Sequence, residues 1–497
     1  MCFANFLENT KKIVGKRVRA MGKNKLTARD RINILLDLMT FEELDASVVD
    51  SDGRISVITG YGKIKDRKVF VFAYDFTVAG GSLSLAASKK ICRAMDLAAQ
   101  AGAPIIGLLE SGGARIQEGV DSLEAYGQIF TRNVLYSGVI PQISVILGPC
   151  AGGAVYSAAL TDFVFMVQGL SQMYITGPAI IKEVTHEEVV LEQLGGALVH
   201  SQKSGNCHFV AGDEKKCFSM VRQLLSFLPQ NNRKAALRLA GASEGRSFQE
   251  ELAAAVPQDL GRPYDMHKVI DKIADEKSFM EVHELFARNL IVGFARMAGR
   301  AVGIIAQQPN FLAGTIDIDA SDKAARFIRF CDCFNIPLVT LIDVPGYLPG
   351  IDQEYRGIIR HGAKLLYAYA EATVPKVSVI LRKAHGGAYV AMSSHGLRGD
   401  INYAWPTSEI AVMGPGQAIN FLYKKEIAQS ENPDKTRKQL INDYREKIAA
   451  PTIAAGRGYI DEVIKPGLTR AKIIKALEIL ENKKQANPWK KHGNIPL

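Results

Sequence analysis

Two glycine-rich stretches of this sequence could place backbone N–H groups beside a reacting oxygen atom. The first, GPCAGGA at residues 148–154, directly follows an apolar run at 143–147 that we expect to be a buried strand. Gly152 and Gly153 have no Cβ, so a ligand can approach their backbone closely. At the start of a helix such N–H groups suit an anion or a developing oxyanion. A tight strand-to-helix turn, with glycines for packing alone, is the alternative interpretation.

The second stretch repeats the first after about half the chain. The segment PKVSVIL at 375–381 leads to HGGA at 385–388, and Gly386 follows Gly152 by 234 positions (386 − 152). Upstream, identical residues recur at an offset of 233: Gly81 and Gly314, Ala87 and Ala320, Ser88 and Ser321, Lys90 and Lys323, Pro104 and Pro337. A repeat of this length corresponds to a whole domain rather than to one unit of a solenoid. The sequence therefore predicts a duplicated domain.

Each half carries another glycine-bearing turn after an earlier strand. These turns are SGGAR at 111–115, which contains Gly112, Gly113, Ala114 and Arg115, and VPGY at 344–347. In open parallel sheets, ligands bind at the carboxyl ends of the strands. Two N–H groups there can hold an oxygen that gains negative charge in the transition state, at about 3 kcal/mol per donor. The enolate of a thioester carries such an oxygen.

Motifs for several other chemistries are absent from the sequence. The glycines lack the order of a dinucleotide-binding unit, and neither a phosphate loop nor a Gly-x-Ser-x-Gly elbow occurs. His361, His385, Glu110 and Asp343 could act as acid–base groups, although a lone histidine beside a turn is more often a structural hydrogen-bonding group. The seven cysteines form no Cys-x-x-Cys pair, so we predict no metal site.

The composition is that of a globular protein with a mild basic excess. The 497 residues include 61 Lys and Arg against 51 Asp and Glu, a formal charge of +10. That balance suits a phosphate-rich small molecule, and no recognised module or aromatic-interleaved basic run favours nucleic acid. The sequence has no run of eighteen apolar residues and no signal-type segment. We therefore expect a cytoplasmic protein with no direct membrane insertion.

The elements expected to position both sites alternate strand and helix, which predicts an α/β fold of parallel units in two domains, 1–235 and 258–497. The expected strands and crossover helices are 69–73, 88–101, 105–109 and 143–147 in the first domain, and 301–306, 322–334, 338–342 and 377–381 in the second. Outside them we expect a helical arm at 1–50, a polar linker at 229–263 with a short helix at 247–255, and a solvated basic end at 483–492.

Longer motifs surround these turns: SGGARIQEGVDS at 111–122, GPCAGGAVYS at 148–157, DVPGYLPG at 343–350 and NYAWPT at 402–407. They resemble the carboxyltransferase subunit of biotin-dependent acyl-CoA carboxylases, of the propionyl-CoA carboxylase β-subunit type. The α-subunits of biotin-dependent acyl-CoA decarboxylases are similar too. The resemblance covers roughly residues 20–480. It implies two duplicated crotonase-like domains of the ClpP/crotonase class.

The same resemblance implies a transfer that uses two oxyanion holes. Gly152 and Gly153 match the hole for the acyl-CoA carbonyl, and residues 112–115 lie on that acyl-CoA side. Gly387 and Ala388, next to Gly386, match the pair that polarises the ureido oxygen of biotin. Carboxybiotin would release CO2, the biotin nitrogen would take the α-proton, and the enolate would attack CO2. Such chemistry needs no side-chain base.

The resemblance also implies partners. The sequence has no Met-Lys-Met biotinyl site and no ATP-binding motif, so a biotin carboxyl carrier protein and a biotin carboxylase would act with it. Family members form homo-oligomers, often hexamers, whose active sites are shared between subunits. Val390 and Glu110 both stand where family members usually have Asp, and Val390 leaves the choice between propionyl-CoA and acetyl-CoA open. A sodium-pumping decarboxylase subunit and a non-catalytic CoA-binding scaffold are the alternatives.

Overall fold

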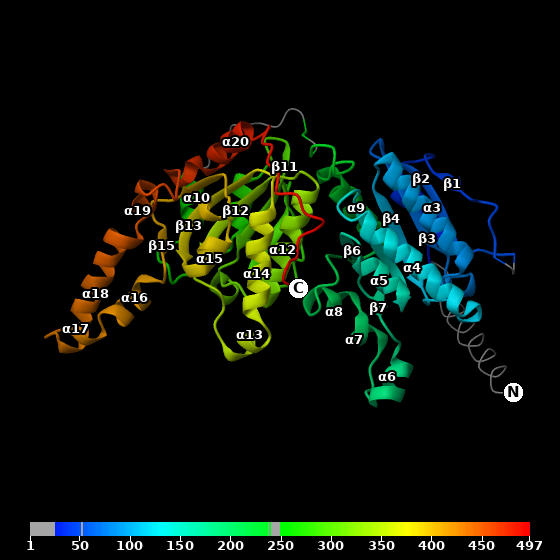
Figure 1. The fold of residues 1–497 in the computed structure, drawn as a ribbon, viewed down its shortest axis with the longest axis horizontal. Coiled ribbons are helices and arrows are strands. Elements are labelled where there is room, and N and C mark those ends of the chain that lie inside the picture. The colour runs from blue at the N-terminus through cyan, green and yellow to red at the C-terminus, as the bar shows by residue number, and fades with distance from the viewer. Residues whose placement is uncertain (1–24, 51–52, 237, 240–248) are drawn as a thin grey trace. The chain divides into compact units, whose positions relative to one another are not determined.

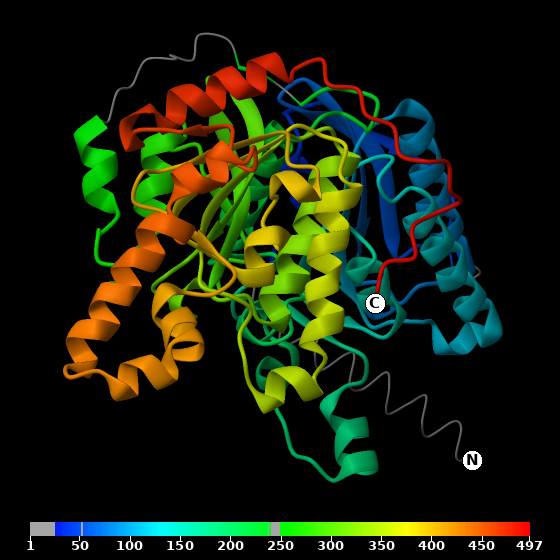
Figure 2. The same ribbon diagram turned by 60° about the vertical axis from the view of Figure 1, so that its left-hand side comes forward.

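The structure is a computed structural model that describes residues 25–50, 53–236, 238–239 and 249–497. The chain divides into two compact units, Met1–Lys234 and Ala235–Leu497. Each unit is built around its own eight-stranded sheet, as Figure 1 and Figure 2 show in two views.

The sheet of the first unit combines an antiparallel hairpin with a parallel section. Its order is β1-β2-β3-β4-β5-β6-β8, with β7 beside β5. The strands are β1 (Glu42–Leu44), β2 (Val57–Ile64), β3 (Arg67–Tyr74), β4 (Ile105–Ser111), β5 (Gln142–Ala151), β6 (Phe163–Val167), β7 (Gln172–Tyr174) and β8 (Phe209–Ala211). Strands β1 to β3 are antiparallel neighbours, and the rest pair in parallel. The sequence prediction missed β2 because Gly60 and Gly62 interrupt its alternation.

The sheet of the second unit has the same topology. Its order is β16-β14-β13-β12-β11-β10-β9, with β15 beside β13. The strands are β9 (Met280–Val282), β10 (Leu290–Met297), β11 (Arg300–Gln307), β12 (Leu338–Val344), β13 (Lys376–His385), β14 (Ile401–Ala404), β15 (Glu409–Ala411) and β16 (Glu462–Val463). Because the strands pair in the same sequence order and directions in both sheets, the predicted duplication is confirmed.

Equivalent helices pack on the two sheets. In the first unit α3 (Leu85–Ala101), α4 (Val120–Leu135) and α5 (Gly153–Ala159) form one group, and α2 (Ala28–Leu35) and α9 (Glu214–Phe227) form another. In the second unit the corresponding groups are α12 (Ile318–Cys333), α14 (Ile358–Glu371) and α15 (Gly386–Ala391), and α11 (His267–Ile273) and α20 (Thr469–Ile479). Even the caps repeat at the offset of 233: Ser84 accepts the Ala87 N–H at 3.1 Å, and Asp317 accepts the Ala320 N–H at 2.8 Å.

The remaining helices connect these elements. They are α6 (Pro178–Thr185), α7 (Leu191–Gly195), α8 (Ala197–Gln202), α10 (Gln249–Ala255), α13 (Ile351–Tyr355), α16 (Pro415–Leu422), α17 (Lys424–Gln429), α18 (Pro433–Tyr444) and α19 (Pro451–Gly456). Within the described ranges, no helix combines the length and apolar character needed to cross a bilayer.

One expectation for the start of the chain is wrong where the structure describes it. The predicted helical arm is helical only in α2, and β1 follows it; residues 1–24 lie outside the described part. The basic end is largely exposed, as predicted, although Lys483 Nζ lies 2.7 Å from the Asp400 carboxylate and Lys490 pairs with Glu371. These two contacts join it to carboxylates that lie far away in the sequence.

Candidate functional site

The two glycine-bearing turns of the first unit touch each other at the carboxyl ends of β4 and β5. A Cβ built on Gly113 would lie 3.1 Å from the carbonyl oxygen of Ala151 and 4.0 Å from the Cα of Gly152. Gly113 also has φ +95°, a backbone conformation that a side chain disfavours. Glycine at this position therefore lets the two turns pack directly against each other.

Gly152 turns the chain from β5 into α5. Its φ is +59°, and its N–H donates to the carbonyl oxygens of Tyr174 at 3.3 Å and Ile175 at 3.2 Å, which continues the pairing of β5 with β7. The first N–H groups of a helix have no intrahelical acceptor, and in α5 these belong to Gly153 and Ala154. In this geometry Gly152 supplies the turn, and Gly153 supplies the N–H group of the predicted pair.

The turn of the second unit repeats this arrangement. Gly386 has φ +61° and begins α15, followed by Gly387 and Ala388. The offset of 234 makes Gly387 and Ala388 the counterparts of Gly153 and Ala154. Gly387 is exposed, and a Cβ built there would meet no atom within 4 Å. The main chain at Gly387 is thus open to a bound molecule.

The loop at residues 112–115 is tied to the body of the first unit. The Gly112 N–H donates to the Gly80 carbonyl at 2.9 Å, and the Gly113 N–H donates to Ser111 Oγ at 3.1 Å. The Arg115 guanidinium is buried and lies 2.6 Å from the Asp50 carboxylate. Ala114 pairs with Leu83 in an isolated bridge. The position of the loop is therefore fixed by these contacts, and the Arg115 charge is neutralised by Asp50.

Both strand-end carboxylates, Glu110 and Asp343, are held in buried ion pairs. Glu110 pairs with Arg31 at 2.7 Å and with Lys25, and Asp343 pairs with Arg382 at 2.8 Å. Both carboxylates are therefore engaged by buried or part-buried cations inside the fold, as expected of structural groups.

Of the two candidate histidines, His361 contacts a carboxylate and His385 is buried. His361 Nδ1 lies 2.8 Å from Asp322 Oδ2. Burial, helped by the nearby Lys383 charge, lowers the pKa of His385 to about 4, so its imidazole is neutral at neutral pH. Its Nε2 lies 3.9 Å from Glu409 Oε2, beside a pocket of about 440 Å³ next to the second glycine turn.

The specificity candidate Val390 lies on α15, two residues after Ala388, with 42% of its surface exposed. No cluster of three His, Cys, Asp or Glu side chains in the described part of the chain could hold a metal ion. The sequence analysis missed Arg31 and Arg382, which contact the strand ends behind the turns. The one feature of the sequence that could have indicated these two arginines is a positive charge next to a run of apolar residues.

These observations define the class of protein: a duplicated α/β chain in which each unit offers helix-initial backbone amides at its strand ends. The family model of the carboxyl transferase domain matches residues 19–495. The chain therefore belongs to the carboxyl transferase family.

Relatives with known names agree with that assignment. The chain is 54% identical to a propionyl-CoA carboxylase carboxyltransferase subunit of Haloferax mediterranei, over 96% of this chain and 94% of that protein. It is 53% identical to the methylmalonyl-CoA decarboxylase subunit alpha of Propionigenium modestum, over 95% and 93% of the two chains. Its structure matches the crystal structure of transcarboxylase 12S, a hexamer with methylmalonyl-CoA bound, at a TM-score of 0.93 and 47% identity, covering 99% and 98% of the chains.

Proposed function

We propose that this chain is the carboxyltransferase component of a biotin-dependent acyl-CoA carboxylase, which moves a carboxyl group from carboxybiotin to the α-carbon of propionyl-CoA or acetyl-CoA. The observation that supports it is the repetition of one amide-presenting turn, at Gly153 in the first unit and at Gly387 in the second. A transfer between two substrates needs two such sites, whereas a scaffold that only binds CoA needs one.

The residues of this chain act through main-chain hydrogen bonds. The Gly153 and Ala154 N–H groups would donate to the thioester carbonyl, whose oxygen gains negative charge as the enolate forms. The Gly387 and Ala388 N–H groups would donate to the ureido oxygen of the biotin group. That group, carried by a partner protein, supplies CO2 and a ring nitrogen able to accept the α-proton. Gly152 and Gly386 set the turns, and residues 112–115 border the acyl-CoA side.

Exposed apolar side chains around both turns support an oligomer with shared sites. In the first unit they include Ile116, Val120, Leu123, Tyr156, Ile175 and Val184, and in the second Ile351, Tyr355, Ile359, Val390, Val412 and Phe421. We take these exposed side chains to be covered by other copies of the chain. A hexamer like that of transcarboxylase 12S, with a biotin carboxylase and a biotin carrier as partners in the cytoplasm, belongs to this proposal.

The purified chain tests the proposal with free biotin as acceptor. Incubation with methylmalonyl-CoA or malonyl-CoA should give carboxybiotin and the decarboxylated thioester, and omitting biotin should stop thioester turnover. No biotin-dependent change in either thioester would refute the transfer itself.

The direction of transfer needs a second experiment, because the similarity to the Propionigenium modestum decarboxylase subunit favours the reverse reaction as the alternative. Addition of a biotin carboxylase, a biotinylated carrier, ATP and bicarbonate should carboxylate propionyl-CoA or acetyl-CoA. Failure of that reconstitution, together with thioester decarboxylation in the presence of a biotinylated membrane subunit, would establish the decarboxylase instead.

A further inference from the structure

The glycine turns of the first unit follow a β-bulge in the pairing of β4 with β5. The register shifts between Leu109 and Ser111, so Glu110 alone faces the three residues 147–149. Such a bulge re-aims the end of a strand, but it also leaves main-chain groups without ladder partners. Buried groups of this kind must find other partners. The partners at this bulge therefore decide where the chain from 148 to 154 points.

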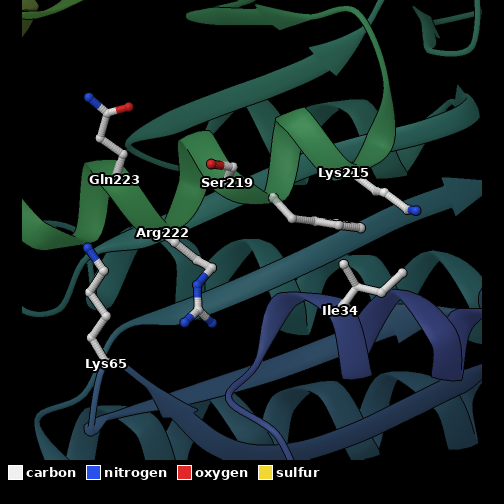
Figure 3. A pocket seen from close by; sticks show the side chains of 7 residues that line it. Ile34, Lys65, Lys215, Ser219, Arg222 and Gln223 are labelled. Atoms are coloured by element: carbon white, nitrogen blue, oxygen red, sulfur yellow. The ribbon is translucent and has the colours of Figure 1, made fainter.

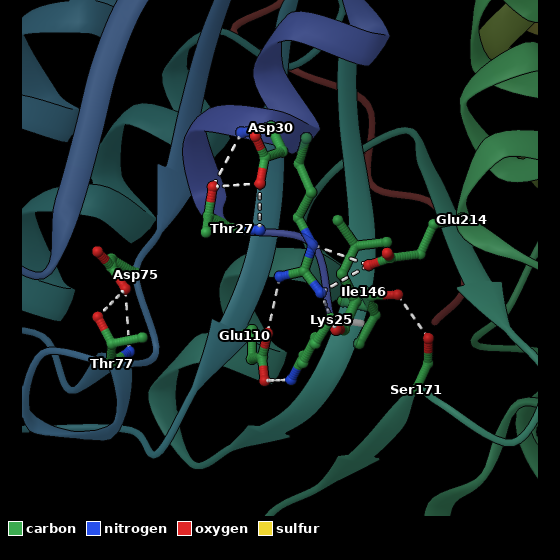
Figure 4. A network of polar contacts seen from close by, with 11 residues as sticks. Lys25, Thr27, Asp30, Asp75, Thr77, Glu110, Ile146, Ser171 and Glu214 are labelled. Atoms are coloured by element: carbon green, nitrogen blue, oxygen red, sulfur yellow. Dashed lines mark hydrogen bonds and ion pairs between the residues drawn. The ribbon is translucent and has the colours of Figure 1, made fainter. Parts of the chain in front are cut away.

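A buried arginine from α2 bonds one of these main-chain groups, the Leu147 carbonyl, together with the Glu110 side chain. Arg31 donates from Nη1 to Glu110 Oε2 at 2.7 Å and from Nη2 to the Leu147 carbonyl at 2.9 Å. Its Nε donates to Glu214 on α9 at 2.8 Å. The side chains of Arg31 and Glu110 are only 3% and 1% exposed. Figure 4 shows this network, with Lys25 as a second cation at Glu110.

The second unit has the same bulge and the same chemistry. The register of β12 and β13 shifts so that Asp343 alone faces residues 381–383. Asp343 accepts the Arg382 Nε–H at 2.8 Å and the Lys383 backbone N–H at 3.2 Å. The Arg382 guanidinium also donates to carbonyl oxygens of the segment at 257–262. A buried guanidinium–carboxylate pair thus lies behind the glycine turns of both units.

The arginine, however, comes from different elements in the two units. Arg382 corresponds to Gly148 at the offset of 234, and a Cβ on Gly148 would lie 2.5 Å from the Glu110 carboxyl carbon. The equivalent strands β1 and β9 begin 238 positions apart (280 − 42), and the preceding helices α2 and α11 align at the same offset. At this offset Arg31 corresponds to Val269. The arginine therefore lies on a helix in the first unit and on a strand in the second, but both units have a buried guanidinium–carboxylate pair at the bulge.

We propose that Arg31 and Arg382 are positioning residues, each for one substrate site: Arg31 aims the Gly153 turn at the acyl-CoA carbonyl, and Arg382 aims the Gly387 turn at the biotin ureido group. Buried ion pairs are seldom the most stabilising choice for a core, so their presence at both bulges fits a role in geometry. The assignment of the two sites to the two substrates rests on the proposed function.

The experiment compares Arg31→Gln and Arg382→Gln with a matched control, Arg222→Gln. Arg222 also anchors α2, by donating to the Leu35 carbonyl at 2.7 Å and to Asp37, but it does not reach the bulge. Figure 3 shows Arg222 lining a pocket together with Ile34 of α2. The second unit has the same anchor in Arg470, which bonds the Ile273 carbonyl and Asp275, so this contact is a general feature of the fold.

The measurements are the equilibrium Kd for the acyl-CoA, the KM for the acyl-CoA and for free biotin, kcat, melting temperature and oligomer mass. For Arg31→Gln we expect the Kd and KM for acyl-CoA to rise at least tenfold, with the KM for biotin changed less than twofold. For Arg382→Gln we expect the opposite pattern. Arg222→Gln should lower the melting temperature and leave both KM values within twofold.

Arg31→Lys and Arg382→Lys keep the charge but lose the second donor arm, so each should show a smaller shift of the same KM. The proposal is overturned if both glutamine variants change both substrates alike, or if Arg222→Gln reproduces their pattern. If the Gln variants do not fold, the Lys variants decide between the same outcomes. Absence of any transfer in the unaltered protein would refute the proposed function, and the acyl-CoA Kd would still test Arg31.

Discussion

Gly153 and Gly387 offer equivalent N–H groups in different surroundings. A Cβ on Gly153 would lie 2.6 Å from the ring of Tyr126, whereas Gly387 has no neighbouring atom within 4 Å. The first position is therefore filled from behind by a buried aromatic side chain, and the second faces open space. A substitution should disturb packing at Gly153 and access at Gly387.

Gly387→Val should abolish carboxyl transfer while leaving the melting temperature and the Kd for acyl-CoA nearly unchanged, because the added side chain enters open space that the proposed function assigns to biotin. Gly153→Ala should instead destabilise the fold by about 1–3 kcal/mol, since its methyl group meets the Tyr126 ring. Denaturant unfolding and a binding titration measure the two effects. Loss of both transfer and CoA binding in Gly387→Val would argue against separate sites.

Val390 offers a test of acyl specificity. Its exposed side chain follows the second glycine turn on α15, and the family resemblance of the sequence implies Asp at this position. Val390→Asp should change the ratio of kcat/KM for propionyl-CoA to that for acetyl-CoA by about 10-fold, because a charged side chain at the predicted acyl end would interact differently with two substrates that differ by one methylene. Competition between the two thioesters measures the ratio directly, and Val390→Thr, of similar volume, is the control. An unchanged ratio would remove Val390 from the specificity-determining residues.

At the scale of elements, charged side chains fasten helices to the strands that carry the turns. His267 at the start of α11 lies 2.7 Å from Asp265 Oδ1 and 2.7 Å from Glu281 Oε2 on β9. Chiefly through the hydrogen bond that the imidazolium donates to Glu281, these contacts raise the pKa of His267 to about 9. The imidazolium therefore joins α11 to the edge of the second sheet.

This shift makes the stability of the second unit depend on pH in the alkaline range. A pKa raised above the unfolded value of about 6.5 means that the stabilisation is complete below pH ~6.5 and is lost as the pH rises through 9. The free energy of unfolding should fall between pH 7 and pH 10 in the native protein. In His267→Gln that fall should be smaller, although solvent screening limits the difference. Parallel slopes for both proteins would contradict the assignment.

At the scale of the molecule, the duplication gives two sheets whose strand ends each carry a glycine site and exposed apolar side chains. Most of these apolar residues lie on α4, α5 and α6 in the first unit and on α13 to α16 in the second, and Ile116, Ile175 and Val412 lie just before these helices. Because both units leave such surface uncovered, we expect copies of the chain to cover it in solution.

Light scattering should therefore give a mass near six times the 54.2 kDa of one chain. Replacing Tyr355 and Ile359, which are 88% and 79% exposed, by Glu should shift the mass toward smaller species and reduce transfer. The helix α20 residue Ile479, also exposed but remote in sequence from the turns, gives the control Ile479→Glu. A monomer with full transfer activity would contradict a shared active site.

The sequence by itself determined the duplication, the strands before each glycine turn and the turns themselves. Repeated residues at a constant offset, buried apolar runs and glycine without a Cβ are local properties, and they can be read without knowing what packs against them. Gly148 marks the limit: it lies inside β5 rather than in the turn, opposite the bulge at Glu110, whose carboxyl carbon would lie 2.5 Å from a Cβ built there.

Only the tertiary structure decided which backbone N–H groups have acceptors and which charged side chains have ion-pair partners. Gly152 gives its N–H to Tyr174 and Ile175, and Arg31 bonds Glu110 and Leu147, which lie 79 and 116 positions away in the sequence. The burial of Glu110 by two cations likewise depends on where α2 docks. Such contacts join separate elements, and a hydrogen bond or a desolvated ion pair exists only once packing has brought its two partners together.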